Sequence, residues 1–134
     1  LYYKRNFLTF SKPKAGKLTI SHSDRYWGIY DDDIYDIVYD EFEYEGIMDA
    51  YVDIRDSSSN TVYIKVDIPS RYEDRWLNLT HSDKRRLLDY IAHEIFRYYD
   101  YDRVLIDVYV DYDDSLWEYS INYKQNTGEL IRIY

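Results

Sequence analysis

The sequence RWLNLTHSDKRRLLDYIAHEIFRYYDYDRVLIDVYVDY, residues 75–112, decides the fold of this chain. Apolar residues recur every three or four positions from Leu87 to Tyr99, and this spacing predicts an amphipathic helix. Thr80 and Asp83 form a shortened capping box, because the hydroxyl of Thr80 can accept a hydrogen bond from the backbone N–H of Asp83. The expected apolar stripe consists of Leu87, Leu88, Ile91, Ala92, Ile95, Phe96 and Tyr99.

The helical period ends near Asp100, and a period of two follows it. Such an alternation predicts a strand with one buried and one exposed face. A further short strand is expected between Arg75 and Thr80. The two faces of the long strand are Val104, Ile106, Val108 and Val110 against Leu105, Asp107, Tyr109 and Asp111.

Two segments of this region resemble segments earlier in the chain. Residues 77–83 match residues 18–24 at four of seven positions, and residues 105–115 match residues 47–57 at six of eleven. The order is conserved between the halves, and the two shifts differ by one residue. An internal duplication of a β-α-β-β unit accounts for these matches. Chance similarity in a chain rich in Asp and Tyr is the alternative.

The duplication predicts one α+β domain over residues 1–134, an antiparallel sheet with two helices and tandem β-α-β-β repeats. Residues 1–16 are expected as a basic N-terminal arm or edge strand. Residues 17–68 would form the first repeat, with a helix at about 31–43 that ends before a glycine and then an antiparallel hairpin. Residues 75–134 would form the second repeat with an extra C-terminal strand.

The charge of the chain is unevenly distributed. The net charge is −9, and residues 1–17 contain five basic residues and no acidic one. Subtracting these five positive charges leaves −14 on residues 18–134. An acidic body repels nucleic acid and anionic membranes, so neither is expected as a partner. The basic residues are Lys4, Arg5, Lys12, Lys14 and Lys17, which could dock on the acidic body or on an anionic wall polymer, or protect an edge strand.

The amino-acid composition limits the cellular compartments and the kinds of site chemistry that are expected for this chain. The chain contains no Cys, which excludes disulfides, thiolate zinc sites and thiol catalysis. It begins with Leu, so we expect a mature form, a fragment or a trimmed chain from which a signal peptide or anchor could have been removed. No stretch approaches the roughly 20 apolar residues of a membrane span. A secreted or cell-surface bacterial protein fits these features.

The C-terminal part of the chain resembles a known family. A helix precedes a three-strand meander that ends in Asn126-Thr-Gly-Glu-Leu-Ile-Arg-Ile133. This arrangement looks like the PepSY-type helix-plus-meander domains of bacterial exported proteins, over about the last 50 residues. The resemblance implies an envelope or secreted module that holds or inhibits a partner.

Candidate metal sites are few. His22 and His81 occupy equivalent positions after the two helix caps, so they are either exposed rings or a pair that binds a metal or ligand. The Asp111, Asp113 and Asp114 cluster could hold calcium irregularly, although the EF-hand pattern fails because Gly and Glu are missing at its sixth and twelfth positions. Solvated turn carboxylates are the alternative, and no cofactor is otherwise expected.

The abundance of tyrosine, 19 residues, without a recognisable nucleophile or metal constellation favours binding over catalysis. We therefore expect a non-catalytic exported or envelope domain that binds a protein or cell-wall partner through a Tyr-rich sheet face. A metal-dependent hydrolase using His22, His81 and nearby carboxylates is one alternative, and an acidic inhibitor or decoy is another. The candidate contact residues are Tyr51, Tyr63, Tyr109, Trp117 and Tyr119.

Overall fold

The computed structural model describes residues 29–57, 59–112 and 114–134, with side chains from residue 33 onward. The basic arm at residues 1–16, the first expected strand and His22 lie outside the described residues, as does Asp113.

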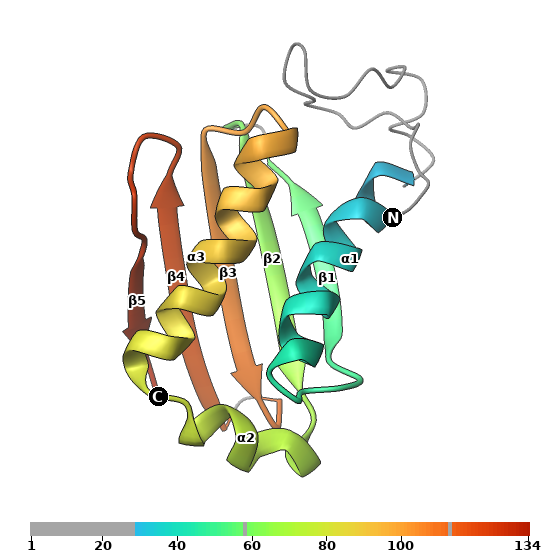
Figure 1. Ribbon diagram of the computed structural model, residues 1–134, viewed down its shortest axis with the longest axis vertical. Coiled ribbons are helices and arrows are strands. Elements are labelled where there is room, and N and C mark those ends of the chain that lie inside the picture. Colours follow the sequence, from blue (N-terminus) through green and yellow to red (C-terminus); the bar gives the residue numbers. More distant parts are fainter. Residues whose placement is uncertain (1–28, 58, 113) are drawn as a thin grey trace.

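Five strands form a single sheet in the order β1-β2-β3-β4-β5 (Figure 1). Each neighbouring pair is antiparallel except β2 and β3, which are parallel. The α+β class is confirmed, whereas the expectation of an entirely antiparallel sheet is wrong at this one pair. The strands are β1 (Tyr51–Asp56), β2 (Thr61–Ile68), β3 (Arg103–Val110), β4 (Ser115–Asn122) and β5 (Glu129–Arg132).

The parallel pair results from the helical connection between β2 and β3. After β2 the chain makes a 3-10 turn, Ser70–Tyr72, and then forms α2 (Glu73–Asn78) and α3 (His81–Tyr98). A crossover of this length returns the chain to the end of the sheet from which β2 started, so that β3 runs in the same direction.

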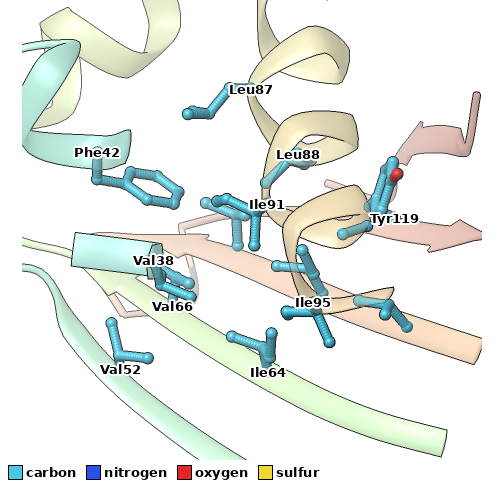
Figure 2. Packing of buried hydrophobic residues seen from close by; sticks show 14 of the residues in the cluster. Val38, Phe42, Val52, Ile64, Val66, Leu87, Leu88, Ile91, Ile95 and Tyr119 are labelled. Atoms are coloured by element: carbon cyan, nitrogen blue, oxygen red, sulfur yellow. The ribbon is translucent and has the colours of Figure 1, made fainter. Parts of the chain in front are cut away.

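Helices α1 (Ile29–Tyr44) and α3 lie side by side on one face of the sheet, and α2 lies at one end of it (Figure 1). Figure 2 shows apolar side chains of α1 and α3 pointing toward those of the strands. Val38 and Phe42 of α1, together with the α3 stripe, pack against Ile64 and Val66 of β2, and all of these are buried. The hydrophobic core therefore lies between the helices and this one face.

The predicted start of α3 is confirmed. The side chain of Thr80 accepts a hydrogen bond from the backbone N–H of Asp83 at 3.0 Å. All seven residues of the predicted stripe are buried. Lys84 is also buried, and its Nζ donates to the backbone carbonyl of Leu79 at 2.6 Å.

The first helix is confirmed at slightly wider bounds than expected, and glycine ends it. Gly46 has a φ of 86°, its N–H donates to the carbonyl of Glu43, and the N–H of Ile47 donates to that of Phe42. These two bonds form a Schellman motif, in which glycine adopts a left-handed conformation at no steric cost.

The short strand expected ahead of Thr80 is wrong, because the segment forms α2. Glu73 and Asp74 occupy its first turn, where the helix dipole stabilises negative charge. Trp76 of α2 is completely buried, stacked on Phe42 at a centroid distance of 6.0 Å and edge-on to Trp117 at 6.1 Å. This aromatic contact holds the helix at the end of the core.

The structure does not confirm the tandem repeat. Helix α1 precedes the β1–β2 hairpin, and α3 precedes the β3–β4 hairpin, so both halves contain an α-β-β unit. However, β1 is antiparallel to β2 while β2 is parallel to β3, so the supposedly equivalent strands β1 and β3 run in opposite directions. Helices α1 and α3 lie on the same face of the sheet, and the strands follow one another in the same order in both units. No rotation can therefore superpose one unit on the other, because only a mirror image reverses the strand directions while it keeps the face and the order.

Among the residues that the structure describes, no helix combines the length and the apolar composition needed to cross a bilayer.

Candidate functional site

The face of the sheet opposite the helices is the candidate functional surface, and we call it the open face. The strand register shows which side chains lie on this face. Tyr63 of β2 is paired with Leu105 of β3 on the open face, while the neighbouring Ile64 and Ile106 point to the core. No described helix packs on the open face. Its central members are Tyr51, Asp53, Arg55, Tyr63, Lys65, Asp67, Leu105, Asp107, Tyr109, Leu116, Glu118, Glu129 and Ile131.

Three of the five predicted contact residues lie on the open face. Tyr51 of β1 is 67% exposed. The hydroxyl of Tyr63 donates to the carboxylate of Asp107 at 2.8 Å, and the pKa of Tyr63 is raised by burial and by this hydrogen bond. Tyr109 lies under the ammonium group of Lys65, whose Nζ is 4.7 Å from the ring centroid.

The other two predicted contact residues, Trp117 and Tyr119, do not belong to this surface. Both lie on the helix-covered face, where Tyr119 is in register with Ile106 and is buried. The Tyr119 hydroxyl donates to the carboxylate of Asp89 on α3 at 2.7 Å, and burial together with this bond raises the pKa of Tyr119. These two aromatic side chains are part of the hydrophobic core and cannot contact a partner on the open face.

A groove of about 740 Å³ opens at the carboxyl ends of β2 and β3, the parallel pair. In open sheets with helical crossovers, ligands bind at this end of parallel strands. The lining comes from three separate segments of the chain. The groove is lined by Asp49, Tyr51, Lys65, Asp67, Ile68, Pro69, Ser70, Arg71, Asp111 and Tyr112.

The backbone around the groove adopts unusual conformations. Asp49, Asp111 and Tyr112 have φ values of 59°, 49° and 65°, and the only other described residue besides glycine with positive φ is Asn60. A bulky residue such as tyrosine rarely adopts this left-handed conformation. The N–H of Asp111 donates to the carbonyl of Ile68 at 2.9 Å, which ties the end of β3 to the end of β2.

Two of the three carboxylates that line the groove are paired with its two cations. Arg71 donates to the carboxylate of Asp49 at 2.7 Å, and its guanidinium lies 5.0 Å from the ring centroid of Tyr72. Lys65 lies 3.8 Å from the carboxylate of Asp67. Burial, followed by a hydrogen bond and repulsion from Asp114, raises the pKa of Asp111.

Of the candidate metal ligands, Asp111 and Asp114 share a hydrogen bond, and Asp113 lies outside the described residues. His81 hydrogen-bonds to the backbone carbonyl of Leu130 at 3.1 Å, and His93 to that of Asn126 at 2.7 Å. Both rings therefore connect α3 to the C-terminal hairpin. Within residues 29–57, 59–112 and 114–134, no group of three or more His, Asp or Glu side chains is suited to a metal ion.

The groove was not anticipated from the sequence. Lys65, Arg71 and Tyr112 were not among the candidates, because their segments come together only through the parallel β2–β3 pair. Two local signals could have located it. Polar Ser70 and Arg71 follow Pro69 after the end of β2, and Asp111 directly follows β3, so polar residues succeed both strands.

Comparisons of the chain with protein-family models, with curated proteins and with solved structures gave no match.

Proposed function

We propose that this chain is a non-catalytic binding domain that holds a partner on the open face of its sheet. The observation that carries the proposal is the unequal covering of the sheet. One face is buried under α1 and α3, while the open face presents aromatic side chains and a groove with no described helix over them.

The composition of the open face supports this proposal. Tyrosine rings supply a large contact area with only two rotatable side-chain angles, so little conformational entropy is lost on binding. Tyr51 and Tyr112 are 67% and 78% exposed and line the groove. Exposed aromatic groups that flank a depression are characteristic of interaction sites.

The charge of the molecule limits the classes of partner that can bind. Residues 18–134 carry −14, so a strongly acidic partner would be repelled, and a neutral or basic one is favoured. A location in the cell envelope or outside the cell fits such a role and stays a prediction.

Site-specific photo-crosslinking tests the proposal. A photoreactive phenylalanine analogue at position 51 or 112 should capture a partner in cells that produce the protein. The matched control is position 44, because Tyr44 is 84% exposed but belongs to α1, on the other side of the sheet. Equal or stronger capture from position 44 would place binding on the helices and contradict the proposal.

A further inference from the structure

We propose that the groove at the ends of β2 and β3 binds a neutral, hydroxyl-rich ligand, namely a short segment of an oligosaccharide chain. The inference rests on the proposed function and names the class of ligand that the open face would take. It follows from the size, the charge pattern, the aromatic rims and the backbone of the groove.

The size of the groove suits a short chain of sugar residues. Its volume of about 740 Å³ falls inside the range of roughly 300–1,000 Å³ found for pockets that enclose small-molecule ligands. It is open to solvent, so the bound segment can belong to a longer polymer.

The charge pattern disfavours an anionic ligand. Each cation of the groove already contacts a carboxylate, as Arg71 does with Asp49 and Lys65 with Asp67. An anionic ligand would compete with these carboxylates and would also meet a third carboxylate, Asp111, in the lining. A neutral ligand avoids this competition and this repulsion, and it leaves both ion pairs in place.

The same ion pairs provide the hydrogen-bond donors and acceptors that hydroxyl groups require. Carboxylates accept hydrogen bonds only, whereas guanidinium and ammonium groups donate only. A sugar hydroxyl both donates and accepts, so it can bridge the two members of a pair such as Arg71 and Asp49. The hydroxyl groups of Ser70 and Tyr51 add further groups of both kinds along the groove.

Two exposed rings flank this polar surface. Tyr51 and Tyr112 belong to segments 61 positions apart in the sequence and line the same groove. Pyranose rings have apolar C–H faces and a polar rim. Flat aromatic rings beside polar groups match this amphipathic shape, because a tyrosine ring is apolar on its faces and polar at its tip.

The backbone of the second tyrosine has an unusual conformation. Tyr112 and Asp111 are both left-handed, with φ values of 65° and 49°. Non-glycine residues in this region cost free energy and concentrate at ligand sites, where the surrounding structure holds them. The hydrogen bond from the N–H of Asp111 to the carbonyl of Ile68 provides such a constraint on the backbone that carries Tyr112.

NMR titration of the full chain tests the inference. The probes are neutral hexasaccharides of glucose, mannose, xylose and N-acetylglucosamine, together with tetralysine and tetraglutamate peptides. We expect saturable amide shifts at Lys65, Ser70 and Tyr112 with at least one hexasaccharide below about 10 mM, and none with either peptide. Tyr51→Ala and Tyr112→Ala should each weaken that binding about threefold to tenfold, whereas Tyr44→Ala on α1 should leave it unchanged.

Two results would overturn the inference. Tetralysine shifts at the groove without any response to the sugars would identify a site for basic peptides. No saturable shift of the wild-type chain with any hexasaccharide would exclude the class. Weaker binding by Tyr51→Ala or Tyr112→Ala assigns the site only where the spectrum of the variant shows a folded protein. If crosslinking from position 51 still captures a protein in either case, the binding function stands and only the ligand class fails.

Discussion

The two faces of the sheet are formed by the same strands but differ in burial and in the kinds of side chain that they carry. On β2, Val62, Ile64 and Val66 are fully buried beneath the helices, while Tyr63 and Lys65 between them are partly exposed. On the covered face, apolar side chains fill the space to α1 and α3 (Figure 2). On the open face, tyrosines alternate with carboxylates and cations.

This difference separates the stability of the molecule from its binding surface. The covered face holds the core, so substitutions there should change the free energy of unfolding. The open face contributes partly exposed pairs, which typically add little to stability. Substitutions there should therefore affect ligand binding more than stability, and four substitution series can test this distinction.

The largest effect is expected for core truncation on β3. Ile106→Ala should lower the free energy of unfolding by about 2–5 kcal/mol, because Ile106 is completely buried among the helix side chains. Its neighbour Leu105 faces the open side and is partly exposed, so Leu105→Ala should cost clearly less. Urea unfolding of both variants measures the difference, and equal losses would show that the open face is packed as tightly as the covered one.

A second comparison concerns the two tyrosine–carboxylate pairs. Asp89→Ala should cost about 1–3 kcal/mol, because it leaves the buried hydroxyl of Tyr119 and the N–H of Gly128 without their acceptor. Asp107→Ala on the open face should cost less, since the hydroxyl of Tyr63 can turn to water. Thermal unfolding measures both, and a greater loss for Asp107→Ala would contradict the assignment of the faces.

The third comparison is between two lysines and depends on pH. Burial, and then the nearby charge of Arg132, lower the pKa of Lys84 below its usual 10.5. The unfolded chain therefore binds more protons than the folded chain between the two pKa values, so this residue's contribution to stability rises with pH up to about 10.5. Relative to Lys84→Met, the wild-type chain should gain stability between about pH 7 and pH 10.

Lys65→Met is the matched control, because Lys65 is a partly exposed lysine of the open face. Its stability difference from the wild type should change less with pH than that of Lys84→Met. Urea unfolding at both pH values gives these differences. A fall in the stability of the wild type relative to Lys84→Met would reverse the sign expected from burial of the ammonium group.

The smallest effect on stability is expected at the rims of the groove. Tyr51→Ala and Tyr112→Ala should each change the free energy of unfolding by no more than about 0.5 kcal/mol, because both rings are largely exposed. Calorimetry measures this directly. A loss of the size expected for Ile106→Ala would mean that these rings support the fold and are not available for binding.

Local patterns predicted the parts of the fold that depend on neighbours in sequence. The cap at Thr80, the α3 stripe, the glycine that ends α1 and the alternation of β3 follow from spacing alone. Helix α2 was missed, because its six residues are too few to show a helical period. The direction of β3 relative to β2 was missed because it depends on the whole crossover.

The candidate surface was only half predictable for the same reason. Alternation shows which side chains of a strand share a face, and it correctly grouped Trp117 with Tyr119. It does not show which face the helices cover, and the register with Val108 and Ile106 placed both aromatic residues in the core. The groove is formed by segments that only the tertiary fold brings together.

The central claim is that the open face is accessible in the full 134-residue chain. Hydroxyl-radical footprinting of the tyrosines, read by mass spectrometry, tests it most directly. Tyr51 and Tyr112 should be oxidised much faster than the buried Tyr99 and Tyr119 of the covered side, which are each about 1% exposed. Protection of Tyr51 and Tyr112 to the level of Tyr119 would show that another layer covers this face and would contradict the account.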